Sequence, residues 1–270
     1  MNTLNRRAFL KTSLAASATA ALATRPSAAR AADAPGASGQ YFELRAYRPR
    51  AGVPTALLDG YLEKALIPAL NRRGIDAVGV FTELEVKPDS PVWVFIAHPS
   101  LDSVASVAAA LNADPAVLAA GADYLEKTSK DHPAFDRIDS WLFLPFAGLP
   151  ALAVPALGRD RKPRIFEMRT YQSPTEVKAL NKVAMFNAGE IGVMQELDLS
   201  PVFYGQALLG RDLPQLTYML CSPDLETHKR NWKAFGAHPT WQRLFHDPQY
   251  ADNVSKVTSI FLEPAPYSQI

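Results

Sequence analysis

The chain has 270 residues, of which 48% are hydrophobic, and a formal net charge of +1. Charges of both signs are nearly balanced and form no basic cluster, which argues against a nucleic-acid-binding protein. Cys221 is the only cysteine, so no internal disulfide can form and stability must come from the burial of apolar side chains.

The first 31 residues are expected to be a twin-arginine export signal. Arg6 and Arg7 precede Phe-Leu-Lys and a weakly apolar run, which ends near Ala31 in the small-x-small pattern of a cleavage site. The alternative is an amphipathic N-terminus or a membrane anchor, but residues 14–23 are too few and too rich in hydroxyl groups to span about 30 Å of hydrocarbon. We therefore expect cleavage after Ala31, a disordered leader over 32–39, and a periplasmic or secreted protein.

Cleavage would change the charge of the chain. Residues 1–31 contain five basic residues and no acidic ones, so their removal lowers the formal charge from +1 to −4. No later segment has the length and apolarity of a membrane span. Twin-arginine export carries folded proteins, which permits a cofactor loaded beforehand, but the sequence indicates none.

The first half of the mature chain shows strand and helix periodicities in the order β-α-β-β-α-β. The expected elements are a strand over 42–48, a helix over 53–73, strands over 77–85 and 92–97, a helix over 102–110 and a strand over 138–144. Gly74 stands where the first helix would be capped.

The second half repeats this order. Its expected elements are a strand over 166–171, a helix over 177–197, strands over 202–208 and 216–221, a helix over 224–235 and a strand over 257–262. Gly189 interrupts the long helix, where it predicts a kink or close packing.

A seven-residue segment also recurs between the halves. Tyr41–Tyr47 reads YFELRAY and Ile165–Tyr171 reads IFEMRTY, and at the same offset Pro115 falls opposite Pro239. A fixed offset between similar segments indicates a duplicated unit. We therefore expect one module over 40–146, a proline-rich linker over 147–163 and a second module over 164–270.

The order β-α-β-β-α-β is typical of the ferredoxin-like motif, an α+β unit that packs both helices on one face of its sheet. Two such units commonly cover their bare faces with each other. We therefore expect tandem modules whose sheets pack as an α/β barrel of the dimeric type, formed within one chain or by exchange between two chains.

The recurring segment carries an acid, a base and a phenol on one face of its strand, because side chains alternate between faces. These candidate lumen residues, which we expect to point toward the opposite sheet, are Glu43, Arg45, Tyr47, Glu167, Arg169 and Tyr171. One interpretation is an internal ion pair that fixes the register of two packed sheets. The other is a polar lumen that binds a small molecule, with arginine holding an anionic group and tyrosine or glutamate acting on a proton.

The histidines give weaker signals. His98 follows a strand, where it would cap the surface or reach a pocket, and His228 is expected on an exposed helix face. No pair of histidines has the spacing of a metal site, and none stands out as a haem ligand, so we expect neither.

Several short segments resemble the NIPSNAP family. They are Glu-Leu-Arg-x-Tyr in the first strand, Pro201–Gly205, Leu216–Leu220 and Pro266–Ile270. The resemblance runs from Tyr41 to the end and is better in the second half. It implies a dimeric α/β-barrel fold, shared with small monooxygenases and haem-handling enzymes, but the family offers no agreed catalytic residues. The leader and an insertion over 121–136 depart from it, so its trafficking roles do not transfer.

Two functions are consistent with these features. The first is an exported protein of undefined activity that binds a small ligand or partner through the barrel interior or a dimer face, as a monomer or homo-oligomer. The second is a cofactor-poor monooxygenase or isomerase-like enzyme with Arg45, Tyr47, Arg169 or Tyr171 in its pocket.

Overall fold

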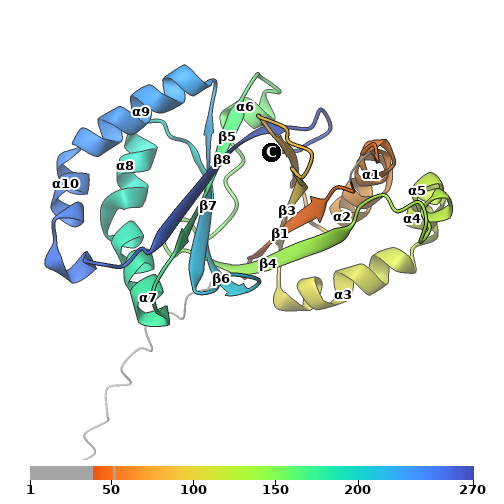
Figure 1. Ribbon diagram of the computed structural model, residues 1–270, viewed down its shortest axis with the longest axis horizontal. Helices are drawn as coiled ribbons and strands as arrows, with labels where there is room; N and C mark the ends of the chain where they lie inside the picture. The colour runs from red at the N-terminus through yellow and green to blue at the C-terminus, as the bar shows by residue number, and fades with distance from the viewer. Residues whose placement is uncertain (1–38, 51–52) are drawn as a thin grey trace, which may run out of the picture. The chain divides into compact units, whose positions relative to one another are not determined.

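Eight strands in the described residues close into an antiparallel barrel, in the order β1-β3-β2-β8-β5-β7-β6-β4 and back to β1 (Figure 1). The structure is a computed structural model and describes residues 39–50 and 53–270, so the expected export signal lies outside the described residues. The strands are β1 (Tyr41–Arg48), β2 (Val78–Glu83), β3 (Val92–His98), β4 (Arg137–Pro145), β5 (Ile165–Gln172), β6 (Pro201–Leu209), β7 (Gln215–Ser222) and β8 (Lys256–Pro264).

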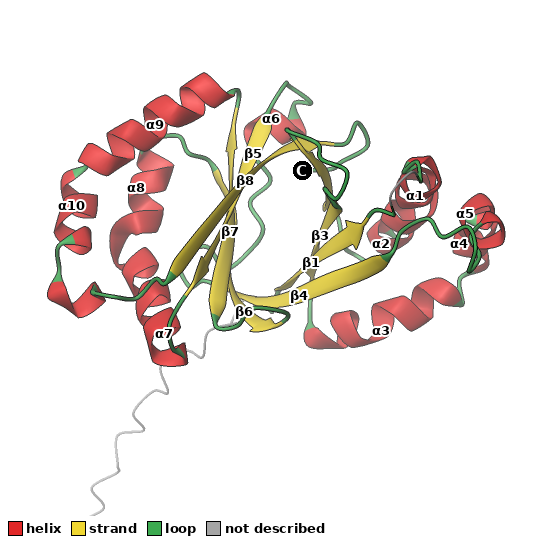
Figure 2. Cartoon of the chain, viewed as in Figure 1, coloured by secondary structure: helices red, strands yellow, loops and turns green. Residues whose placement is uncertain are grey.

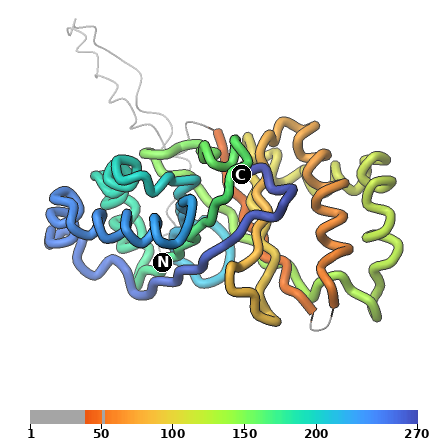
Figure 3. Tube along the Cα trace, turned by 90° about the horizontal axis from the view of Figure 1, so that it is seen from above, coloured from red at the N-terminus to blue at the C-terminus, as the bar shows by residue number. Residues whose placement is uncertain are grey.

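The helices lie outside the barrel in two groups, one on each side (Figures 2 and 3). The first group is α1 (Ala56–Tyr61), η1 (Leu62–Leu66), α2 (Ile67–Asn71), α3 (Leu101–Asn112), α4 (Pro115–Ala120) and α5 (Ala122–Lys127). The second is α7 (Glu176–Met185), η2 (Phe186–Glu190), α8 (Ile191–Glu196), α9 (Leu225–Ala237), α10 (Pro239–Phe245) and the short η3 (Pro248–Tyr250). None of these described helices is long and apolar enough to cross a membrane.

The expected strands are all present, and the mixed α/β fold with a closed barrel confirms the predicted fold at that level. Both long helices differ in detail, because each contains a π-helical turn, η1 or η2, between two α-helical segments. Gly74 ends the first of them with a φ of 78°. The segment expected to be a linker contains one short helix, α6 (Ala156–Arg159).

Gly189 lies inside η2 and has both of the expected properties. Its backbone is not helical, with φ 160° and ψ −21°. A Cβ at this position would also lie 2.8 Å from Thr240 Cγ2 of α10, so a larger residue would force Thr240 or the backbone to shift.

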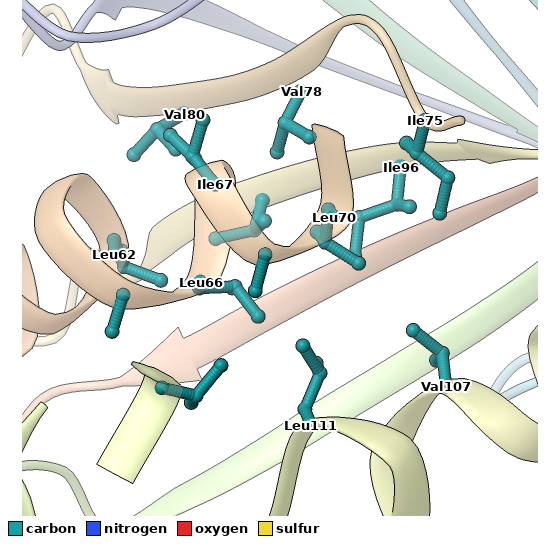
Figure 4. Close-up of a cluster of buried hydrophobic side chains, with 14 of the residues drawn as sticks. Leu62, Leu66, Ile67, Leu70, Ile75, Val78, Val80, Ile96, Val107 and Leu111 are labelled. Carbon is teal, nitrogen blue, oxygen red and sulfur yellow. The ribbon is translucent and has the colours of Figure 1, made fainter. Parts of the chain in front are cut away.

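Each helix group buries an apolar cluster against the outer face of the sheet. Figure 4 shows Leu62, Leu66 and Leu70 of the first group facing Val80 and Ile96 on the strands. Tyr47 belongs to this cluster. The second group buries a matching cluster around Phe186, Tyr204 and Tyr218.

The barrel interior is a separate apolar core. Phe42 and Leu44 of β1, with Phe166 and Met168 of β5, pack there against inward residues of the other strands. Phe95 and Phe203 stack at its centre with ring centroids 4.5 Å apart.

The two faces of β1 and β5 are therefore the reverse of those expected. We predicted that the apolar residues would pack on the helices and the Glu-Arg-Tyr side chains would line the lumen. Instead, Phe42 and Leu44 point inward, while Glu43, Arg45 and Tyr47 point to the helix layer. A closed barrel surrounds its interior with strands that offer few polar partners, whereas the helix layer supplies histidine and serine side chains for buried charges.

Candidate functional site

The interior becomes more polar toward one end of the barrel. β5 lies between β8 and β7, and its inward residues form rows with theirs. In order, the rows are Leu262–Phe166–Cys221, Ile260–Met168–Met219, Thr258–Thr170–Thr217 and Lys256–Gln172–Gln215. We call the end with the last row the barrel mouth.

A cavity of about 250 Å³ opens at the barrel mouth. Its floor is apolar and its rim is polar, following the rows described above. The lining residues are Leu44, Trp93, Trp141, Phe143, Met168, Thr170, Gln172, Arg211, Asp212, Gln215, Thr217, Lys256 and Thr258. A concave apolar site with a few polar groups is the usual form of a small-molecule site.

Two tryptophans of the first half form part of the cavity wall. Trp93 in β3 and Trp141 in β4 have ring centroids 6.2 Å apart at an interplanar angle of 32°. Trp141 Nε1 donates a 3.3 Å hydrogen bond to the carbonyl oxygen of Arg211. Trp93 Nε1 is buried and has no hydrogen-bond acceptor among the described residues. A buried N–H without a partner costs about 1–3 kcal/mol, so a hydrogen-bond acceptor placed beside this group would be stabilising.

The charged side chains at the rim differ in their pairing. Arg211 Nη2 lies 2.9 Å from Asp139 Oδ2, and Arg48 Nε lies 3.3 Å from the same oxygen. Lys256 is exposed and makes no ion pair with any described residue, and the same holds for Asp212. With Arg211 counted, the charged lining of the cavity has a formal charge of +1.

The first Glu-Arg-Tyr triad forms a hydrogen-bonded network outside the barrel. Arg45 Nε and Nη2 donate to the two carboxylate oxygens of Glu43 at 2.7 and 2.8 Å. His98 Nε2 donates to Glu43 Oε2 at 3.0 Å, and its Nδ1 lies 3.1 Å from Ser103 Oγ. Ser140 Oγ donates to Glu43 Oε1 at 3.0 Å. His98, for which we expected surface capping or a pocket, is fully buried.

The second triad forms a matching network. Arg169 Nη1 donates to Glu167 Oε1 at 2.6 Å, and Ser259 Oγ donates to the same oxygen. His228 Nε2 and Trp232 Nε1 donate to Glu167 Oε2 at 2.8 and 2.7 Å. The prediction that His228 lies on an exposed helix face is wrong: it is 1% exposed, because α9 turns it toward the carboxylate.

The tyrosines complete the two networks differently. Tyr171 Oη lies 2.9 Å from Tyr218 Oη and accepts a 3.2 Å hydrogen bond from Arg169 Nε. Tyr47 interacts with Arg45 and packs edge-on against Phe135. Burial raises the pKa of Tyr171, despite the nearby Arg169 guanidinium that lowers it. The Tyr171 phenol therefore stays protonated at neutral pH.

Both glutamates are held as carboxylates. Burial alone would raise their pKa, but hydrogen bonds from His98 and Arg45 outweigh it and lower the pKa of Glu43 from 4.5 to about 2. Against the same burial, His228, Arg169 and Ser259 lower the pKa of Glu167 to about 2. Carboxylates with this many partners have little capacity left for a ligand, which favours a structural role for the triads. Their role in binding stays a prediction.

Sequence reasoning missed the residues that line the cavity. Trp93 lies on the inward face with Phe95, and Lys256 begins the last strand. Neither stands in a motif, and their proximity depends on the closure of the barrel. A metal site is also not suggested, since no described residues form a group of three or more metal-ligating side chains.

Known proteins with a similar sequence or structure have a fold consistent with the one described above. The model of the NIPSNAP family matches residues 166–269. A candidate monooxygenase from Fusobacterium nucleatum has a similar structure, with a TM-score of 0.54 and 6% identity over 84% of this chain and 93% of that one. A candidate monooxygenase from Lactobacillus acidophilus gives the same TM-score and identity, over 84% and 94%. At these identities the likeness shows the fold alone.

A NIPSNAP-like domain protein from Burkholderia xenovorans is 22% identical over 39% of this chain and 88% of its own. Its TM-score of 0.35 is too low to support a structural argument. No curated protein matches the chain.

Proposed function

We propose that this chain is an exported NIPSNAP-type protein, built from two related modules, that binds a small molecule at the barrel mouth. The observation that carries the binding proposal is the cavity itself, which has an apolar floor and a polar rim. Its wall includes Trp93, whose buried N–H lacks an acceptor among the described residues. A ligand with a hydrogen-bond acceptor would satisfy this donor and cover the apolar floor around Leu44 and Met168.

The pairing of the triads supports placing the site at the mouth and not on the helix face. Every charged group of the two triads already has a partner within 3.0 Å. A ligand there would have to break these contacts, whereas at the mouth it would add contacts to groups that lack them. The enzyme alternative, with Arg45, Tyr47, Arg169 or Tyr171 as pocket residues, rests only on the fold likeness to candidate monooxygenases, and we do not propose it.

Four features support two related modules, and the first two recur at an offset of 124 positions. The π-helical turns begin at Leu62 and Phe186. α4 and α10 begin at Pro115 and Pro239, the two prolines that align in the sequence. In the barrel the first four strands follow the order β4-β1-β3-β2 and the last four the order β8-β5-β7-β6. The Glu-Arg-His-Ser networks also recur.

Export is proposed from the leader alone. A strain expressing the full chain should release it from the cytoplasm, and changing Arg6→Lys with Arg7→Lys should retain the precursor there. Lys11→Arg serves as the matched control with the arginine pair intact. Export that survives the double change would count against a twin-arginine route.

The binding proposal is tested by screening small molecules for a rise in the melting temperature of the purified protein. The hits should lose most of their effect in Trp93→Phe, which removes the N–H but keeps an aromatic ring. Trp232→Phe is the matched control, because its N–H serves Glu167 on the helix face. Hits that depend on Trp232 and not on Trp93, or no hits from a broad library, would contradict a ligand site at the mouth.

A further inference from the structure

We infer that the ligand of the barrel mouth is a small aromatic carboxylate, bound with its rings on the tryptophan wall and its carboxylate at Lys256. This inference rests on the proposed function of the same cavity. The cavity has a polarity gradient: its floor holds Leu44 and Met168, and its rim holds Lys256 and Gln172. A cavity graded in this way fits a molecule with an apolar body and one polar end.

The tryptophan wall of the cavity indicates that the apolar part of the ligand is aromatic. Trp93 and Trp141 both line the cavity, and Phe143 lies beneath them at the floor. Aromatic rings attract each other in offset or edge-to-face packing beyond the burial of their area, and a saturated ring would not gain this attraction. The Trp93 N–H adds a requirement for an acceptor atom, which a carboxylate oxygen or a ring substituent can supply.

The charged side chains at the rim of the cavity indicate that the ligand carries one negative charge. Arg211 lies 2.9 Å from Asp139, which Arg48 also contacts, so the charge of Arg211 is compensated in part. Lys256 has no such partner among the described residues, and it lies beside Gln172 in the outermost row. The carboxylate of Asp212 also lines the cavity and would oppose a ligand with more negative charge. A single carboxylate matches the free ammonium group.

The volume limits the size of the ligand. The cavity of about 250 Å³ is smaller than the range of about 300–1,000 Å³ typical of sites for drug-sized ligands. One or two fused rings with a carboxylate fit this space, whereas a porphyrin or a dinucleotide does not.

Three matched probes test the ligand class by calorimetry on the purified protein: 2-naphthoate, its neutral amide 2-naphthamide, and the saturated decahydro-2-naphthoate. We expect 2-naphthoate to bind at least about threefold more tightly than either analogue. Lys256→Met should remove the preference for the acid over the amide. Raising the salt concentration should weaken binding of the acid only, because salt screens an exposed charge pair.

Lys233→Met on α9 is the matched control, since Lys233 is an exposed lysine outside the cavity lining. Equal affinity for acid and amide, equal affinity for the aromatic and saturated acids, or an unchanged preference in Lys256→Met would overturn the inference. Ligands of another class that depend on Trp93 in the broad screen would overturn the inference but leave the proposed function standing. If neither the probes nor the screen respond to Trp93→Phe, the proposed function fails as well.

Discussion

His98 at the end of β3 and Ser222 at the end of β7 occupy matching positions, and each takes part in a histidine–serine hydrogen bond to the neighbouring helix. His98 supplies the imidazole of its bond, whereas Ser222 supplies the hydroxyl. His98 pairs across the strands with Tyr41, and Ser222 pairs with Ile165 at the same offset. In the first half the strand supplies histidine and the helix supplies Ser103. In the second half the strand supplies serine and the helix supplies His228. Both arrangements place an imidazole between a serine hydroxyl and a glutamate.

This exchange predicts that the second arrangement can be transplanted into the first half. His98→Ser should destabilise the protein by about 2–4 kcal/mol, because it leaves a cavity and removes a partner of Glu43. Val104 is the fourth residue of α3, as His228 is of α9. Adding Val104→His should therefore recover at least half of the loss, measured by urea unfolding.

Val104→His alone is the control for this cycle, since it places a second imidazole beside His98. If the effects of the two substitutions simply add, with no favourable coupling, the matching of the two networks is incidental.

The buried ion pair between Lys182 and Glu190 distinguishes the second helix layer from the first. Both residues are almost fully buried, at 4% and 1% exposure, and they contact each other directly. The residues 124 positions earlier are Leu58 and Leu66, which are equally buried. The same packing site therefore accepts either an ion pair or two leucines.

We expect Lys182→Leu alone to cost about 3–5 kcal/mol, because it leaves Glu190 buried without its partner. The double change Lys182→Leu with Glu190→Leu should be near neutral or stabilising, since a buried pair replaced by apolar side chains often loses nothing. Chemical denaturation of both single variants and the double variant measures this coupling. A double variant as unstable as Lys182→Leu alone would show that the pair itself stabilises the fold and would contradict this expectation.

Acid should unfold the protein through Glu43 and Glu167. Their pKa is lowered from 4.5 to about 2 in the folded state, so each stabilises the fold fully above pH 4.5 and loses this contribution as the pH falls toward 2. The shift corresponds to about 3 kcal/mol per carboxyl as an order of magnitude. Glu167→Gln should make the free energy of unfolding less dependent on pH in this window. An unchanged pH dependence of the free energy of unfolding would mean that the partners of Glu167 do not stabilise its carboxylate.

Ile270 should be important for stability but not for ligand binding. Its side chain is fully buried in the barrel interior near Gly79, and it is not part of the cavity lining. Ile270→Ala should cost about 2–5 kcal/mol, by analogy with other large-to-small changes in a core. Val86→Ala, at an exposed site, is the control and should cost less than about 0.5 kcal/mol. Thermal unfolding without 2-naphthoate measures the loss of stability. The rise in melting temperature on adding 2-naphthoate measures ligand binding, which Ile270→Ala should leave intact.

The strands were predictable because each is a short run with a clear boundary, from Tyr41–Arg48 to Lys256–Pro264. Their alternation separated the two faces of β1 correctly, with Glu43 and Arg45 on one and Phe42 and Leu44 on the other. Alternation does not tell which face is enclosed. That depends on where a charge finds partners, and His98 and His228 lie far from the glutamates in sequence.

The candidate site was not predictable for a related reason. Trp93, Trp141 and Lys256 come from three strands that meet only when the barrel closes. Each has an ordinary role by itself, as an apolar strand residue or an exposed charge. The Glu-x-Arg-x-Tyr segment recurs in both halves, and recurrence favours shared architecture over a single asymmetric site.

The central claim, that the ligand site lies inside the barrel mouth and not under the helices, is tested most directly by a crystal structure of the protein with 2-naphthoate. We predict ordered density for the ligand at the mouth, with its rings against Trp93 and Trp141 and its carboxylate beside Lys256. Ligand density beside Glu43 or Glu167 on the helix face, with none at the mouth, would contradict it.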